Sequence, residues 1–314
     1  MSKPHYEYSL PHGIMFHHFM NDVHPWSQGA ITADKLVDII EYVGPKNIIS
    51  CEEWQERSVK GTLENHHLCF TFDDSLLCQY DIAWPVMKKY GITGFFFIYS
   101  CVFDGKPANL EMYRYFRSVA FDSIDAFYDV FFKQMDDYLP GLYDEKMRGM
   151  DIDQYLIDYP FFSTMDRAFR YVRDHVLTTD QYEKIMDDLI SQYGFNKQDI
   201  IDKLWMTNGQ LKELHDAGNA IGLHSYSHPI PLKRLPADKQ TEEYQKNYDH
   251  IMKATGAAPT SMSHPANSYG DDTIPILRNL NIQLGFRADM AKVADPNEFE
   301  YPRQDHTNLV NMMQ

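Results

Sequence analysis

The sequence of 314 residues contains no run of about 18 apolar residues, so it predicts no membrane-spanning helix. It has only four cysteines, in mostly apolar stretches and without CxxC spacing, and we expect them to be reduced and buried. The N-terminus lacks the charged-then-apolar pattern of a secretory signal. Together these features predict a cytoplasmic protein.

Basic residues are also scarce, because 29 Lys and Arg stand against 45 Asp and Glu, giving a net charge of −16. A field of that sign disfavours nucleic acid and anionic membrane surfaces as partners. The content of 44% hydrophobic and 24% charged residues is typical of a soluble protein with a large core. A small soluble molecule is therefore the expected ligand.

Short apolar runs alternate with helical patterns, which predicts β/α units and a mostly parallel sheet or barrel. Strands are expected over residues 13–19, 68–72, 92–98, 220–223, 282–286 and 299–303. Thr32 and Thr207 are expected helix N-caps, and further helices are expected over 82–90 and 239–254. The segment of about 104–205 carries helix-period apolar residues and predicts a helical insertion within a single domain spanning 1–314. Its role as a lid, a substrate wall or a dimer surface stays open, and so does a homo-oligomer.

Two pairs of polar residues directly follow expected strands. Asp73-Asp74 follows the strand over 68–72, and His224 with His228 follows the strand over 220–223. Functional residues of parallel α/β folds collect at such strand ends. The simpler alternative for the carboxylates is a helix N-cap with a favourable acid behind it. Adjacent buried carboxylates repel each other and are costly to desolvate, however, and a metal cation offsets both costs.

One carboxylate and two imidazoles leave an open position on a divalent metal, which is typical of a catalytic zinc site. Ser225 follows His224 and Pro229 follows His228, so the pair indicates a loop and not the helical motif of zinc proteases. The spare carboxylate is then available to take a proton from water on the metal. This combination predicts metal-assisted hydrolysis.

At these residues the chain resembles the polysaccharide deacetylase family, carbohydrate esterase family 4. Thr71-Phe-Asp-Asp74 is similar to the first family motif and His224-Ser-Xaa-Xaa-His228 to the second, within about 14–99 and 206–309. The resemblance implies an α/β fold, a distorted (β/α) barrel with fewer than eight strands. It also implies that Asp74, His224 and His228 bind a divalent metal, zinc being the first choice. Asp73 would be the base in hydrolysis of an N-acetyl or N-formyl group on a sugar or sugar derivative.

The third family motif departs from the usual pattern. Ser263 stands where members carry an Arg that holds the catalytic Asp, so Arg303 or Arg287 is expected to supply this contact from a later strand end. A backbone N–H near Asn267 to Tyr269 is expected to stabilise the oxyanion, and both residues are expected to line the substrate pocket.

The segment 301–306 resembles the Pro-Arg-Xaa-Asp ending of members in surface-sugar pathways. It places Arg303 and Asp305 at the site and makes His306 a candidate acid, whereas the alternative is an exposed charged loop. His18, after the first strand, is expected either to contact substrate or to be structural.

Two rival functions remain on this evidence. One is a hydrolase of a non-sugar C–N bond on the same scaffold. The other is a non-catalytic carbohydrate-binding protein, which the missing third-motif Arg makes credible.

Overall fold

The computed structural model describes residues 6–106, 108–156 and 162–314, so the first five residues of the N-terminal segment lie outside it. The chain divides into two compact units. Residues 1–108 and 205–314 form the first, here called the barrel unit, and residues 109–204 form the second, the helical unit. The helical unit lies within the segment predicted as an insertion, while the single-domain organisation stays a prediction.

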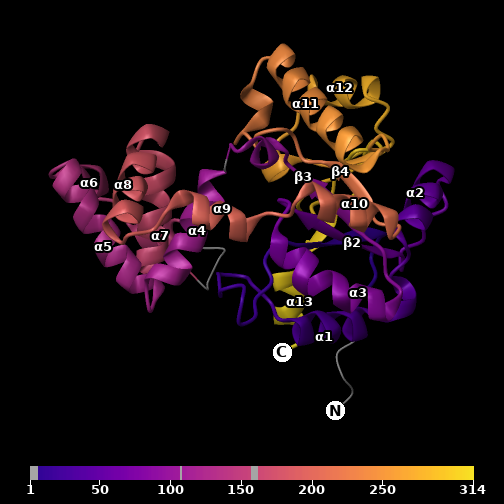
Figure 1. Cartoon of the computed structure of the whole chain (residues 1–314), viewed down its shortest axis with the longest axis horizontal. Helices are drawn as coiled ribbons and strands as arrows, with labels where there is room; N and C mark the ends of the chain where they lie inside the picture. The colour runs from indigo at the N-terminus through magenta and orange to yellow at the C-terminus, as the bar shows by residue number, and fades with distance from the viewer. Residues whose placement is uncertain (1–5, 107, 157–161) are drawn as a thin grey trace. The chain divides into compact units, whose positions relative to one another are not determined.

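Seven parallel strands form the sheet of the barrel unit, in the order β6-β5-β4-β3-β2-β1-β7 (Figure 1). They are β1 (His12–Phe16), β2 (Leu68–Asp73), β3 (Phe95–Ile98), β4 (Ala220–Leu223), β5 (Ser261–Ser263), β6 (Leu284–Phe286) and β7 (Arg303–Asp305). The chain approaching β7 runs along β6, where Tyr301 N donates to Gly285 O at 3.0 Å. The sheet therefore forms a nearly closed barrel of fewer than eight strands, as predicted.

Aromatic side chains fill much of the sheet interior. The rings of Phe72 and Phe96 stack at 4.5 Å between centroids, and those of Phe95 and Phe97 at 5.9 Å. A Cβ on Gly222 would lie 2.7 Å from the Phe97 ring, so β4 can pack this closely only with glycine. The central strands are thus buried on both faces, which explains their continuous apolar runs.

Helices cover the outside of the sheet in two groups (Figure 1). One group contains α1 (Ala33–Val43), α3 (Trp84–Tyr90) and α13 (His306–Met312), and the other α10 (Asn208–Asp216), α11 (Ala237–Thr255) and α12 (Thr273–Asn279). The predicted N-caps are present, because Thr32 Oγ1 accepts from Lys35 N and Thr207 forms a capping box with Gln210. These caps satisfy backbone N–H groups that have no partner inside the helix.

The structure differs from the predicted elements in several places, and helices α12 and α13 were not predicted. β7 begins at Arg303, four residues later than expected, because residues 299–302 run beside β6 with only an isolated bridge at Tyr301. β5, with the sequence Ser-Met-Ser, lacks an apolar run and was missed. Helix α2 (Cys51–Lys60) was also missed, and its Trp54 packs on Phe286 of β6.

The four cysteines are free and buried, as expected. No helix among the described residues is long and apolar enough to cross a membrane.

The helical unit builds a core of its own. Its helices are α4 (Asn109–Ala120), α5 (Ile124–Tyr138), α6 (Leu142–Met147), α7 (Thr164–Tyr171), α8 (Thr179–Gln192) and α9 (Lys197–Leu204). Fully buried side chains line the contacts between α5, α7 and α8, among them Phe127, Phe131, Phe169, Ile185 and Leu189. This segment therefore folds as a compact helical body, consistent with its helix-period pattern.

Candidate active site

Three side chains at the carboxyl edge of the sheet form a ligand set for a metal. Asp74 follows β2 directly, while His224 and His228 follow β4, and their ligand atoms lie within 4.8 Å of one another. Asp74 Oδ1 is 3.6 Å from His224 Nε2 and 3.8 Å from His228 Nε2. One carboxylate oxygen and two imidazole nitrogens fit a divalent cation such as zinc.

The backbone of these residues is unusual. Asp74 has φ 77°, Ser225 has φ 62° and His228 has φ 53°, all in the left-handed region that non-glycine residues rarely adopt. Such conformations cost on the order of 1 kcal/mol each and cluster where function requires a particular side-chain direction. Here they occur at Asp74 and His228, two of the three candidate ligands.

His224 is held in the form that binds metals. Its Nδ1 lies 2.9 Å from the carbonyl oxygen of Ser263, so Nδ1–H donates there and the Nε2 lone pair faces Asp74. Burial lowers the pKa of His224 to about 3, although the charge of Asp73 acts in the opposite direction. A neutral imidazole with a free Nε2 is what a metal site requires.

Asp73 does not join the ligand set but is held by Arg303. The two guanidinium nitrogens Nη1 and Nη2 each donate to one Asp73 oxygen at 2.7 Å, and Asp73 is only 2% exposed. Ser263 Oγ accepts from Arg303 at 2.7 Å and lies 3.4 Å from Asp73 Oδ2. Burial raises the pKa of Asp73, but the charge and hydrogen bonds of Arg303 outweigh it and leave the pKa below its usual range.

The contact expected from a later strand end is therefore made by Arg303, at the start of β7. Arg287 contacts other groups instead, since its Nε donates to Glu300 O and its Nη1 pairs with Asp289. Ser263, which stands in the position of the family Arg, accepts a hydrogen bond from the Arg303 guanidinium that holds Asp73. The catalytic roles of these residues stay predictions.

His17 is a site residue that the sequence analysis missed. Its Nε2 lies 3.8 Å from Asp73 Oδ2 and 3.9 Å from Asp74 Oδ2. Burial lowers the pKa of His17 to about 4, against the charges of Asp73 and Asp305. We expected His18 at this place, but the pairing of Phe16 with Phe72 puts residue 17 beside Asp73. The choice between His17 and His18 depends on the register between β1 and β2.

The side chains of Asn267 and Tyr269 form contacts that stabilise the loop to which they belong. Asn267 Nδ2 donates to Asp289 Oδ2 at 2.6 Å. Tyr269 OH donates to Glu300 Oε1 at 2.7 Å, and its ring stacks on His264 at 4.1 Å. Both side chains are thus already engaged, and their expected contact with substrate stays a prediction.

The backbone of this loop offers one candidate oxyanion donor. Asn267 N and Ser268 N already donate to His264 O and Pro265 O. Tyr269 N has no acceptor in the part of the chain that the structure describes. Of the three N–H groups considered from sequence, that of Tyr269 is the one left for a ligand.

Asp305 and His306 support local structure. Asp305 Oδ1 caps α13 by accepting from Thr307 N at 2.8 Å. The ring nitrogens of His306 lie 3.1 Å from Met15 O and 2.7 Å from Gly29 O, and the residue is 3% exposed. The structure therefore does not bring the His306 ring nitrogens to the metal ligands, and its role as an acid stays a prediction.

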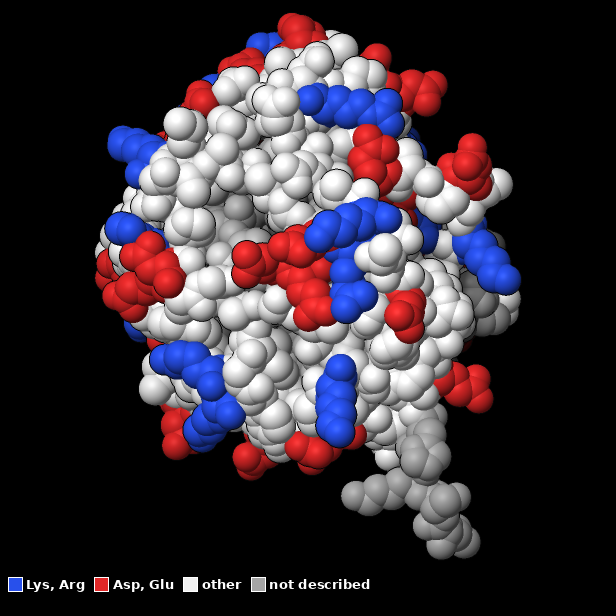
Figure 2. All heavy atoms as spheres, turned by 90° about the vertical axis from the view of Figure 1, so that its right-hand side faces the viewer, with Lys and Arg blue, Asp and Glu red and all other residues white. Residues whose placement is uncertain are grey.

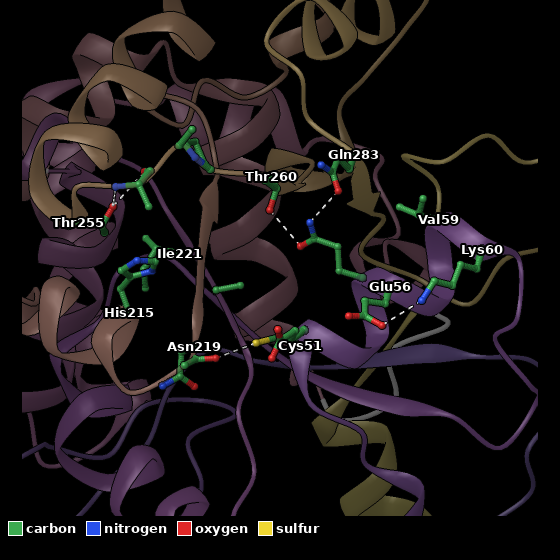
Figure 3. Close-up of a pocket in the computed structure, with 17 residues that line it drawn as sticks. Cys51, Glu56, Val59, Lys60, His215, Asn219, Ile221, Thr255, Thr260 and Gln283 are labelled. Carbon is green, nitrogen blue, oxygen red and sulfur yellow. Dashed lines mark hydrogen bonds and ion pairs between the residues drawn. The ribbon is translucent and has the colours of Figure 1, made fainter.

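A hollow of about 700 Å³ lies at the opposite edge of the sheet, beside α2 and the amino ends of β4 and β5 (Figure 3). Its polar groups bond to one another: Gln55 joins Gln283 and Thr260, and the Cys51 thiol donates to Gly218 O. Figure 2 shows the face that carries α2, where acidic and basic side chains are interspersed around a largely uncharged area. This hollow contains none of the expected site residues.

Comparisons with known proteins point to one family. The sequence model described as polysaccharide deacetylase matches residues 170–285. The Streptococcus pyogenes deacetylase PplD, solved with acetate, has a TM-score of 0.53 and 15% identity, with 97% of this chain and 98% of that chain covered. A de-N-acetylase from Aggregatibacter actinomycetemcomitans has a TM-score of 0.56 and 12% identity, with 96% of this chain and 99% of that chain covered. IcaB from Ammonifex degensii has a TM-score of 0.54 and 15% identity, with 96% of this chain and 93% of that chain covered.

Comparison with curated protein sequences gave no match. At these identities the structural neighbours show the fold, and the sequence model shows a likeness to the family over residues 170–285. The family supports carbohydrate deacetylation as the class of reaction. The resemblance first seen in the Asp73-Asp74 and His224–His228 motifs is confirmed: the family model of polysaccharide deacetylases matches residues 170–285, which include His224 and His228, and the solved neighbours share the fold.

Proposed function

We propose that the protein is a metal-dependent hydrolase that removes an acetyl or formyl group from the nitrogen of a sugar or sugar derivative. The observation that carries the proposal is that a metal-ligand set and a separately held carboxylate lie side by side at the carboxyl edge of the sheet. Asp74, His224 and His228 form a ligand set, and the neighbouring Asp73 is kept out of it by two hydrogen bonds from Arg303. Base and ligand are thus separated by geometry, although they are adjacent in sequence.

A divalent metal held by Asp74, His224 and His228, for which zinc is our first choice, would supply Lewis acidity to the water nucleophile and the amide carbonyl. Asp73 takes the proton from the attacking water. Arg303 keeps the Asp73 carboxylate ionised and fixes its orientation. The N–H of Tyr269 donates to the oxygen on which negative charge develops.

The low pKa of Asp73 has a mechanistic consequence. Because Arg303 lowers the pKa of Asp73, the carboxylate is a weaker base than a free aspartate, so it takes the proton most readily from a water that a bound metal would acidify. The protonated form is correspondingly a stronger acid than a free aspartic acid and can return the proton to the leaving amine. Turnover should therefore depend entirely on the metal, and protein treated with a chelator should be inactive.

A non-catalytic binding protein is less well supported by this geometry. That alternative rested on the missing Arg of the third motif. Arg303 supplies two hydrogen bonds to Asp73 from β7, so the carboxylate is held despite Ser263. A protein that only bound sugar would gain nothing from an ionised carboxylate beside a metal ligand set.

We further propose a small sugar derivative of surface-glycan biosynthesis as substrate, handled in the cytoplasm. The test is to incubate zinc-loaded and chelated protein with N-acetylated and N-formylated small sugars, and with long chitin or peptidoglycan fragments. Acetate or formate release from a small sugar by the zinc-loaded protein alone is expected. Release from the long polymers only would refute the substrate class, and equal release by chelated protein would refute the metal.

A further inference from the structure

The helical unit contains four arginines that come together from two neighbouring segments. Arg114 and Arg117 lie three residues apart on α4, and Arg170 at the end of α7 lies three residues before Arg173. Residues at this spacing share one face of a helix. All four are half-buried, in a chain whose net charge is −16.

Arg117 is the centre of this cluster. Its Nε is fully buried and has no hydrogen-bond partner, and none of the described carboxylates lies within ion-pair distance of it. Its guanidinium carbon lies 5.5 Å from the centre of the Phe127 ring and 5.3 Å from that of Phe169. The Arg173 guanidinium lies 5.8 Å from the same Phe169 ring, so one aromatic side chain is shared by two cations.

Tyr182 on α8 adds a second unused donor. Its ring contacts Phe169 at 6.3 Å and Tyr113 at 5.6 Å between centroids. The residue is 8% exposed, and its hydroxyl is buried without a hydrogen-bond partner. Burying polar groups without partners is unfavourable. Two such donors beside like charges indicate that an acceptor belongs between them.

The carboxylates nearby have other partners. Glu111 pairs with Arg114 at 2.9 Å, and Asp174 accepts from Arg173 at 2.6 Å. Asp166 caps α7 together with Ser163 and also accepts from the Tyr128 hydroxyl. Burial lowers the pKa of Arg117, and the charges of Arg114 and Arg173 lower it further. No described anion thus compensates the charge of Arg117.

We propose that the helical unit binds the phosphoryl group of a phosphorylated small molecule, with Arg117 and Tyr182 as the central donors. A phosphoryl group carries up to two negative charges and several acceptor oxygens, which suits several guanidinium groups better than a single carboxylate does. The site lies wholly within residues 109–204 and does not depend on the proposed deacylase activity.

The test is calorimetric titration of the full chain at constant ionic strength. Inorganic phosphate, a sugar phosphate and the same sugar without phosphate are the probes. We expect one saturable site for the two phosphates and none for the plain sugar. Arg117→Gln should weaken phosphate binding at least about tenfold, because charged hydrogen bonds contribute most. Tyr182→Phe should weaken it by about threefold to tenfold.

Lys184→Gln is the matched control, because Lys184 also lies on α8 but is exposed and paired with Asp188. It should bind phosphate like the wild type. Since Tyr182→Phe removes only one oxygen, it decides the question if Arg117→Gln does not fold. No saturable phosphate binding in the wild type, unchanged binding in Tyr182→Phe and in a folded Arg117→Gln, or equally tight binding of acetate would each overturn the proposal.

Discussion

Replacing Arg303 by methionine is the most informative perturbation of the site. Arg303 is 1% exposed and Asp73 is 2% exposed, and both hydrogen bonds between them measure 2.7 Å. Removing one partner of such a buried pair leaves an uncompensated charge, which costs about 3–5 kcal/mol of the free energy of unfolding. Arg303→Met should lose stability in that range at pH 7 in chelated protein.

The loss should also depend on pH. In the wild type the folded-state pKa of Asp73 lies below the unfolded value, so the pair stabilises fully above about pH 4 and is lost as pH falls through the folded pKa. Without Arg303, burial raises the pKa of Asp73 with much less opposition. The variant then loses stability as pH rises above about 4. The difference between the two proteins should therefore be larger at pH 7 than at pH 4.

Urea unfolding of chelated wild type and variant at pH 4, 5.5 and 7 measures this difference. Arg287→Met is the matched control, because Arg287 is also buried but contacts backbone carbonyls and the more exposed Asp289. Its effect should vary little over this range. If Arg303→Met lowered the free energy of unfolding by the same amount at all three pH values, the conclusion that Arg303 stabilises an ionised, buried Asp73 would be refuted.

Three further predictions concern the surroundings of the site. His17→Gln should keep the metal but lower turnover about 100-fold, because misplacing groups around Asp73 is costly; unchanged turnover would exclude His17 from the site. Gly13→Ala should cost about 1–3 kcal/mol in urea unfolding, because the new Cβ would lie 3.1 Å from Arg303 Cγ. Gly209→Ala, with its nearest neighbour at 3.8 Å, is the control and should be neutral or stabilising. His306→Ala should lower stability by about 1–3 kcal/mol with metal content unchanged, and loss of metal instead would place His306 at the site.

The ligand residues could be predicted because they directly follow strands with strong signals. Asp73-Asp74 comes after five buried apolar or β-branched residues, and His224 after a buried strand bounded by Gly218. Parallel strands bring such ends to one edge whatever the details of packing. A cation from a later strand end, Arg303 or Arg287, could be inferred as well, since a buried carboxylate requires a cation and Ser263 cannot supply one. The structure shows that Arg303 makes this contact.

The choice between neighbouring residues could not be made in the same way. His17 and His18 differ only in strand register, and a shift by one residue turns a side chain to the opposite face. Asn267 and Tyr269 have side chains bonded to Asp289 and Glu300, which are 22 and 31 residues away in sequence. Hydrogen bonds over such separations are set by tertiary packing, so a local motif does not reveal them.

The most direct test of the central claim is metal content together with acyl release for the wild type, Asp73→Asn and His228→Ala, each loaded with zinc and freed of excess. The account predicts about one metal per chain in the wild type and in Asp73→Asn, with turnover in Asp73→Asn reduced by about 10²–10⁴-fold. His228→Ala should lose both metal and turnover. Full turnover in Asp73→Asn, or unchanged metal in His228→Ala, would contradict the assignment of base and ligands.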